Sequence, residues 1–413
     1  MSGRLNTLLK LQCFFNMNVL TKLSNYISRH VSRFLDRPIV RSGQKIDVSL
    51  LWMIILLTAF SLLMIYSASI AYAAAEGGNQ YSFLYKQAIF IILGVVVCGI
   101  ISLFKMTSWK KFMPWYFALC GILLVVVLGV GREINGATRW IHIGPINLQP
   151  TEMFKLAVIL YLASLFTRKA EVLQSVKKII KPGSLLVVGL ILIMAQPDFG
   201  SFAVIIGIIM GMLYLAGFPP KYFAMMSMMV LIGMGGLIVA APYRMARFAG
   251  FLDPWADPLG KGYQLTHSLM AIARGEWLGV GLGASLEKRF YLPEAHTDFI
   301  FAVIGEEFGF LGMCVLVFCY GWLVVRAFSI GKQARDLDLI FSAYVANGIG
   351  IWIWIQSFFN IGVNIGILPT KGLPLPLMSY GGSAVVIMLI CMTLLLRIDY
   401  ENRQKMRGYQ IEG

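Results

Sequence analysis

The feature that most constrains this chain is a series of apolar blocks, each roughly 17 to 25 residues long, which is the length of a membrane-spanning helix. Each helical residue adds about 1.5 Å, so such a block spans about 30 Å of hydrocarbon. Charged residues make up 13% of the 413 residues, against about 25% in a soluble domain. We therefore predict an all-α polytopic membrane protein with about ten transmembrane helices. The blocks cover residues 48–72, 83–104, 112–131, 151–167, 182–196, 199–217, 221–241, 298–326, 339–364 and 377–397.

The distribution of positive charge predicts the orientation of these helices. With a cytoplasmic N-terminus, the inner segments carry 24 Lys or Arg residues and the outer segments carry nine. Because Lys and Arg are retained on the cytoplasmic side, we predict that both termini are cytoplasmic. Residues 1–47 would then be a basic N-terminal tail, 48–397 the membrane domain and 398–413 a C-terminal tail.

The net charge of +15 does not indicate nucleic-acid binding, which requires a basic face on a soluble domain. The basic residues lie in short segments between apolar blocks, where anionic lipid headgroups attract them. We therefore expect membrane lipids and no nucleic acid as partners. The six cysteines include no CxxC pair, and five lie in apolar blocks where a thiol behaves as a small hydrophobe. They predict neither a disulfide nor a metal site.

Two connections on the predicted outer side are unusual. Only Gln196-Pro197-Asp198-Phe199-Gly200 joins blocks five and six, which predicts a tight helical hairpin. Blocks seven and eight are separated by residues 242–297, far more than an ordinary connection, and such long loops are usually functional. This periplasmic loop is turn-rich and then amphipathic. We expect it to form short helices over the outer mouth of the bundle.

Ionisable residues inside or beside the blocks are the candidates for chemistry, because a charge in lipid is costly. Glu152 and Lys155 are three residues apart and share one helical face. They fit either a local ion pair or a functional site. Asp298 opens block eight, and Glu306 follows about two turns deeper on the same stripe. This spacing predicts a polar face directed into the bundle.

Two outer segments leave alternatives open. Glu294, His296 and Asp298 include metal-ligating types, but they enter a helix from a loop with no second histidine nearby. A carboxylate at an apolar mouth suits a general base better, since partial burial raises its pKa. Residues 366–384 contain three prolines and Gly381-Gly382, which fits either a plain loop or a polar site at membrane depth.

Five motifs carry a resemblance to a known family: WIHIGPINLQPTEMFKLA (140–157), AQPDFGS (195–201), GYQLTHSLMAIARGEWLGVGLG (262–283), YLPEAHTDFIFAVIGEEFGFLG (291–312) and LPTKGLPLPLMSYGGS (368–383). In this order the chain resembles the SEDS proteins (shape, elongation, division and sporulation), membrane glycosyltransferases of bacterial peptidoglycan synthesis. The resemblance covers residues 48–403. The strings PEAHTDF, IGEE and PTKG and the basic tail are more similar to the division member than to the elongation member.

The resemblance implies the substrate, the partners and the location. Lipid II, a disaccharide-pentapeptide on undecaprenyl diphosphate, would be polymerised into glycan strands for the septal wall. A class B penicillin-binding protein, the division transpeptidase, would be the closest partner, alongside other divisome membrane proteins. The chain would lie in the bacterial inner (plasma) membrane at the division septum. A lipid II flippase and a non-catalytic divisome scaffold remain the alternative functions.

The resemblance also implies roles for individual residues. Asp298 would be the essential carboxylate and general base, and Lys155 would lie close to it across the bundle and keep it ionised. No tightly bound cofactor or metal is expected, but Mg²⁺ could accompany the substrate diphosphate. The candidate substrate-binding residues are Arg139, Glu152, Arg244, Arg247, Lys288, Arg289, His296, Lys371 and Ser379.

Overall fold

The computed structural model describes residues 46–410, apart from residues 76–78, 135–136, 144–145, 175 and 240–241. Nearly all of the predicted tail 1–47 therefore lies outside the described residues. All of the described residues belong to the compact unit that begins at Lys45.

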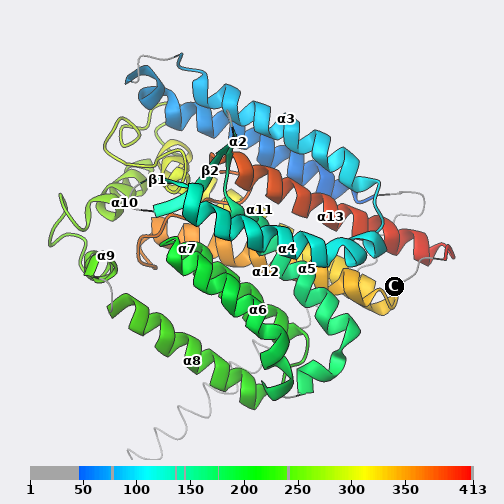
Figure 1. Cartoon of the computed structure of the whole chain (residues 1–413). Helices are drawn as coiled ribbons and strands as arrows, with labels where there is room; N and C mark the ends of the chain where they lie inside the picture. Colours follow the sequence, from blue (N-terminus) through cyan, green and yellow to red (C-terminus); the bar gives the residue numbers. More distant parts are fainter. Residues whose placement is uncertain are drawn as a thin grey trace, which may run out of the picture. The chain divides into compact units, whose positions relative to one another are not determined.

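Within the described part of the chain, ten long helices follow the ten apolar blocks, which confirms the predicted helical membrane fold (Figure 1). Among the described residues, eight helices are long and apolar enough to cross a membrane. The other two are α7, which is apolar but shorter, and α12, which carries several Asn and Gln residues. The ten are α2 (Val48–Ala75), α3 (Ser82–Ser102), α4 (Met106–Val130), α5 (Pro150–Arg168), α6 (Val176–Ala195), α7 (Phe199–Leu215), α8 (Pro220–Val239), α11 (Ile300–Asp336), α12 (Ile340–Asn364) and α13 (Gly382–Met406).

The start of α2 and the end of α13 lie at the same end of the bundle. Asp47 accepts a hydrogen bond from the Ser49 amide at 3.1 Å and so caps α2. Its other carboxylate oxygen accepts from Arg326 of α11, which in turn lies 4.0 Å from Asp399 of α13. A chain that crosses the membrane an even number of times must have both ends on the same side. The position of these two helix ends therefore agrees with the prediction that both termini are cytoplasmic.

A small antiparallel sheet on the predicted outer side was not expected from the sequence. It has the order β1-β2-β3, formed by β1 (Arg132–Ile134), β2 (Ala137–Ile143) and β3 (Ile146–Leu148). In the register, His142 of β2 pairs with Asn147 of β3. The sheet lies in the connection from α4 to α5, and β2 carries Arg139.

The loop between α8 and α11 contains two short helices, α9 (Pro242–Leu252) and α10 (Tyr263–Gly275), as predicted. The loop is tied to α11 where that helix is interrupted by Gly309, which has φ +67°. There the Phe310 amide donates to the Glu276 carbonyl at 2.8 Å, and the Leu311 amide donates to the Trp277 carbonyl at 3.1 Å. Loop carbonyls thus accept the hydrogen bonds of α11 amides that have no carbonyl partner within the interrupted helix.

The helices differ in how deeply they are buried. In α5, 78% of the most apolar 18-residue window is buried, and in α13 the share is 72%. In α8 it is 0%, and Figure 1 shows α8 at the edge of the bundle, where it packs against α7 and α9. The buried centre, formed with α11 and α12, therefore supports the outer segments that carry the candidate site.

Candidate active site

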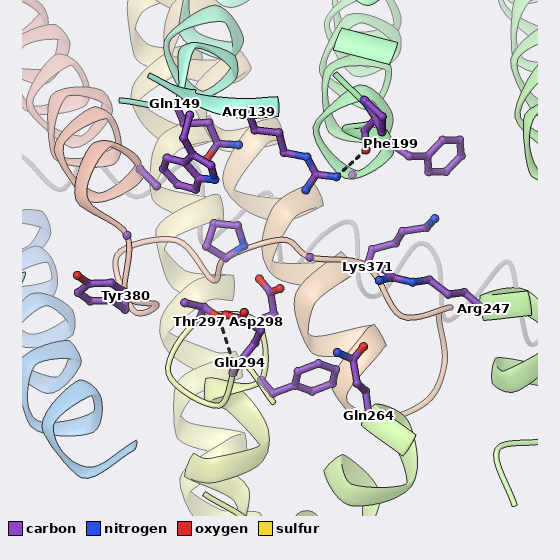
Figure 2. A pocket seen from close by; sticks show the side chains of 18 residues that line it. Arg139, Gln149, Phe199, Arg247, Gln264, Glu294, Thr297, Asp298, Lys371 and Tyr380 are labelled. Atoms are coloured by element: carbon purple, nitrogen blue, oxygen red, sulfur yellow. Dashed lines mark hydrogen bonds between the residues drawn. The ribbon is translucent and has the colours of Figure 1, made fainter. Parts of the chain in front are cut away.

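A cavity of about 700 Å³ opens at the end of the bundle where α11 begins (Figure 2). Six segments contribute to its wall: β2, the residue before α5, the turn between α6 and α7, the loop helices, the residues before α11, and the segment around the start of α13. It is lined by Arg139, Trp140, Gln149, Pro197, Phe199, Gly200, Arg247, Gln264, Glu294, Thr297, Asp298, Phe299, Lys371, Gly372, Pro374, Tyr380, Gly381 and Ala384.

Asp298 lies in this wall, two residues before α11, and its carboxylate points into the cavity (Figure 2). Gly372 allows the chain to pass close by, because a Cβ at that position would lie 2.9 Å from Oδ2 of Asp298. Among the described residues, none donates a hydrogen bond to this carboxylate. The group is therefore positioned through its backbone, with its side chain directed at the cavity.

The pKa of Asp298 is raised to about 7, mainly because the carboxyl group is buried and also because the negative charge of Glu294 lies nearby. The guanidinium groups of Arg139 and Arg247 oppose this rise, while Asp198 adds a smaller raising effect. A carboxyl group with a pKa near 7 is partly ionised at neutral pH and can take a proton from a substrate hydroxyl. This property suits a general base.

Two asparagines of α12 hold the backbone of Asp298. Asn360 Nδ2 donates to the Asp298 carbonyl at 2.8 Å and to the Leu373 carbonyl at 2.7 Å. Asn364 Nδ2 donates to the same Asp298 carbonyl at 3.0 Å. The amide of Ala302 donates to Asn364 Oδ1 at 3.1 Å, which ties the first turn of α11 to the same group. These bonds fix the segment that bears the carboxylate.

The structure corrects the predicted position of Lys155. Its ammonium group is fully buried and donates to Glu152 at 2.7 Å and to Gln356 at 3.1 Å. Lys155 and Asp298, both of which the structure describes, form no ion pair. The local pair with Glu152 is thus retained, and the lysine reaches the Asp298 segment only indirectly through α12. A buried ammonium needs the nearest carboxylate, and Glu152 lies one turn away.

Three of the predicted diphosphate-binding cations line the cavity. The Arg139 side chain donates to the Pro197 carbonyl at 2.5 Å and lies 4.0 Å from Asp198. The Lys371 ammonium lies 4.4 Å from the centre of the Phe199 ring. Arg247 comes from α9, and Figure 2 shows it on the same side of the cavity as Lys371.

The other predicted cations are placed elsewhere. Lys288 is buried and donates to Glu307 at 2.6 Å and to Ser67 at 2.8 Å, so it is not positioned to contact a molecule in the cavity. Arg289 is exposed and is not part of the cavity wall. The side chain of Arg244 lies outside the described residues.

His296 and Ser379 flank the cavity as supports of the Asp298 segment. The Ser379 hydroxyl donates to the Thr297 carbonyl at 2.6 Å and accepts from the Leu375 amide at 2.7 Å. The His296 ring centre lies 4.9 Å from that of Phe83, and the His296 carbonyl accepts from the Tyr380 amide at 2.9 Å. These contacts hold the segment before α13 against the residues before α11.

The predicted polar stripe of Asp298 and Glu306 is not present. Asp298 precedes α11, whereas Glu306 lies within it and points away from the cavity. The Glu306 carboxylate accepts from Ser285 at 2.5 Å, from the Leu286 amide at 2.9 Å and from Arg274 at 3.1 Å. This carboxylate therefore anchors the large loop.

A family model described as "Cell cycle protein", covering FtsW, RodA and SpoVE, matches residues 48–404. The chain belongs to the FtsW/RodA/SpoVE family. A relative from Neisseria gonorrhoeae (strain NCCP11945), named "Probable peptidoglycan glycosyltransferase FtsW", is 63% identical over 92% of this chain and 90% of its own length. The comparison confirms the resemblance drawn from the motifs, including the division member. This member of the FtsW/RodA/SpoVE family is a multi-pass membrane protein.

Solved structures of this family share the fold. A chain from a peptidoglycan synthase complex that coordinates polymerization and crosslinking is 27% identical and has a TM-score of 0.69, covering 87% of this chain and 99% of that chain. The crystal structure of Thermus thermophilus rod shape determining protein RodA is 24% identical with a TM-score of 0.63, covering 89% and 98% of the two chains.

Sequence reasoning missed the polar residues of α12 that support the site in this FtsW/RodA/SpoVE member. Gln356, Asn360 and Asn364 are spaced by four residues, so they lie along one face of the helix. Gln356 Nε2 donates to the Pro374 carbonyl at 2.8 Å, next to the two asparagines that hold Asp298. Three carboxamides at this spacing in an apolar block are the signal that could have identified them.

Proposed function

We propose that this chain is a peptidoglycan glycosyltransferase of cell division that polymerises lipid II into glycan strands. One observation carries the proposal: a carboxylate with a pKa near 7 faces a cavity whose wall also holds three cations. Relatives that match this chain over most of their length are named as probable peptidoglycan glycosyltransferases. The cavity lies at the end of the bundle that the charge distribution assigns to the outer side, where the headgroup of an outward-facing lipid would lie.

In the proposed reaction Asp298 acts as the general base. The 4-hydroxyl of the acceptor N-acetylglucosamine attacks C1 of the donor N-acetylmuramic acid, and its proton passes to the Asp298 carboxylate. A new C1–oxygen bond forms while the bond from C1 to the diphosphate oxygen breaks. Positioned proton transfer of this kind contributes about 10²- to 10⁴-fold to a rate.

Arg139, Arg247 and Lys371 are the proposed partners of the departing undecaprenyl diphosphate. Both Arg and Lys bind phosphate oxygens, and cations placed where negative charge develops stabilise the transition state. Arg139 is already oriented by the turn between α6 and α7. Its donors are therefore held in place before substrate binds, which reduces the ordering that the reaction requires.

Lys155 is proposed to support the site indirectly. Its ammonium holds Gln356 of α12, which lies one turn before the asparagine that binds the Asp298 carbonyl. Glu152 compensates the buried charge of Lys155. We therefore propose that the pair maintains the geometry of α12 rather than touching the substrate.

We propose Mg²⁺ as a counter-ion of the substrate diphosphate and not as a resident of the protein. Among the described residues, no group of three or more His, Cys, Asp or Glu side chains is placed to hold a metal ion. A bound Mg²⁺ would therefore need oxygens from the diphosphate and water for most of its ligands.

A class B penicillin-binding protein is the proposed partner, and the division septum of the inner membrane is the proposed location. Two findings support these assignments. The matching family is described by its part in the cell cycle, and one solved relative is a chain of a complex that couples polymerization with crosslinking.

The proposal is tested with the purified full-length chain and its transpeptidase in liposomes that contain lipid II. Glycan ladders on a gel are expected from the unmodified chain and from Asp336→Asn, which alters an exposed carboxylate at the far end of α11. Asp298→Asn should give no ladder. Movement of labelled lipid II without any glycan would favour a flippase. A scaffold predicts neither product nor movement.

A further inference from the structure

A second cavity, of about 470 Å³, lies at the opposite end of the bundle from Asp298. It is formed by the start of α4, the last turns of α13 and residues 409–410. Ala384 lines the first cavity and Arg397 lines this one. The two residues lie 13 positions apart on α13 (Gly382–Met406), and at about 1.5 Å per residue this separates the cavities by roughly 20 Å along the helix. This second cavity therefore does not belong to the candidate active site, and we name it the inner cavity.

Glu401 fixes the inner wall of this cavity. Its carboxylate is buried and accepts from the Met106 amide at 3.0 Å and from Arg397 Nε at 2.9 Å. Its negative charge is therefore already engaged by the first turn of α4 and by its neighbour on α13. An anion entering the cavity would face little uncompensated negative charge from this residue.

Two cations face the inner cavity. Arg397 is held in a defined orientation, since Nη1 donates to the Ser102 carbonyl at 3.0 Å and the guanidinium lies 5.2 Å from the Tyr400 ring centre. Lys105 lies at the rim and is exposed. An oriented guanidinium beside an exposed ammonium is a suitable pair of donors for phosphate oxygens.

Two exposed apolar side chains precede the cavity residue Lys105 in the chain. Leu103 is 78% exposed and Phe104 is 46% exposed, and both directly precede Lys105. The charge distribution assigns this end of the bundle to the cytoplasm, where the leaflet carries anionic lipids. The inner cavity thus combines a polar chamber with an adjoining apolar surface at the level of the lipid headgroups.

We propose that the inner cavity binds the phosphate headgroup of an anionic phospholipid from the cytoplasmic leaflet. The phosphate contacts Arg397 and Lys105, the side chain of Gln404 is available to headgroup hydroxyls, and the acyl chains lie over Leu103 and Phe104. This lipid is bound independently of the reaction proposed above. It would fix the link between α3 and α4 against the end of α13.

The proposal is tested by native mass spectrometry of the full-length chain in detergent, titrated with phosphatidylglycerol, phosphatidylethanolamine or inorganic phosphate. Lys105→Gln should weaken phosphatidylglycerol binding about fivefold, the effect expected for one Lys near a phosphate. Arg397→Lys keeps the charge near Glu401 but loses the oriented fork, and should weaken binding to a similar extent.

Lys111→Gln is the matched control, because Lys111 is an exposed lysine of the same segment outside the cavity wall. It should leave phosphatidylglycerol affinity unchanged, and the melting temperature of Lys105→Gln should equal that of the unmodified chain. Equal losses in Lys105→Gln and Lys111→Gln would overturn the site, as would equal affinity for phosphatidylethanolamine. Equally tight binding of inorganic phosphate would overturn the lipid assignment.

Discussion

Two kinds of carboxylate lie within ten residues of each other around the start of α11. Asp298 faces the cavity of the candidate active site. Its carboxylate accepts no hydrogen bond from the described residues, and its pKa is about 7. Glu307 is buried and accepts from Lys288 at 2.6 Å and from Ser67 at 2.7 Å. The Asp298 carboxylate is thus available to a substrate, whereas the Glu307 carboxylate is already hydrogen-bonded to protein groups.

This difference separates residues that can do chemistry from residues that hold the fold. A carboxylate whose oxygens are already bonded gains nothing by taking a substrate proton, because it would lose its partners. A carboxylate held only through its backbone can change protonation without disturbing its support. Asp298 has this property because Asn360 and Asn364 bind its carbonyl and leave its side chain open.

Replacing the Asp298 carboxylate with an amide tests its role as the base. Asp298→Asn should lower the polymerisation rate by about 10²- to 10⁴-fold, since the amide cannot accept the proton. Burial disfavours the charged carboxylate, so the neutral amide should leave the melting temperature at pH 8 equal or higher. Glycan synthesis and thermal unfolding of the same preparation measure both. Substantial activity in the variant would contradict the assignment.

The buried ion pair between Glu307 and Lys288 should contribute to stability and not to catalysis. Lys288→Met should destabilise the chain by about 3–5 kcal/mol, because it leaves the buried Glu307 charge unpaired. Adding Glu307→Leu should restore most of the stability, since an apolar pair of similar size can replace a buried ion pair. Unfolding in detergent measures both variants. If Lys288→Met were stable but bound lipid II weakly, the lysine would contact substrate after all.

The third prediction tests how Asp298 is held. Asn364→Leu removes the hydrogen bonds to the Asp298 carbonyl and from the Ala302 amide, and should lower kcat about tenfold with little change in KM. Ser357→Ala is the matched control, because Ser357 is buried on the same helix and its hydroxyl makes no hydrogen bond within the described chain. Equal effects of both variants on kcat would indicate a general packing role.

Replacing Arg247 tests whether a cation of the cavity wall binds the substrate diphosphate. Arg247→Gln should raise KM for lipid II about fivefold, as one phosphate partner is lost. Arg247 also lowers the pKa of Asp298, so its removal should move the acid limb of the pH profile to higher pH. Arg289→Gln, an exposed change outside the cavity wall, serves as the control. Equal changes in both variants would mean that only overall charge matters.

The helices of the fold could be predicted because burial in lipid imposes one constraint on every span. The outer sheet could not be predicted from that constraint, since it lies outside the apolar blocks. A local signal was present, however. Asn135-Gly136 separates two short segments, and this dipeptide favours a two-residue hairpin connection.

The site was only partly predictable, because its pairings join residues far apart in the sequence. Asp298 and the lining cations Arg139, Arg247 and Lys371 could be proposed from motifs and charge. The partner of Glu307 is Lys288, 19 residues earlier in a loop, together with Ser67 on α2, 240 residues away. Periodicity places side chains on a helix face, but it does not identify what packs against that face.

The role of Asp298 as the base is tested directly by the pH dependence of kcat/KM for glycan polymerisation. If Asp298 is the base with a pKa of about 7, the rate should rise about tenfold per pH unit below pH 7 and level off above it. The residual activity of Asp298→Asn should lack this limb. A rate that is flat between pH 5 and pH 8, or an acid limb that persists in Asp298→Asn, would show that Asp298 is not the base.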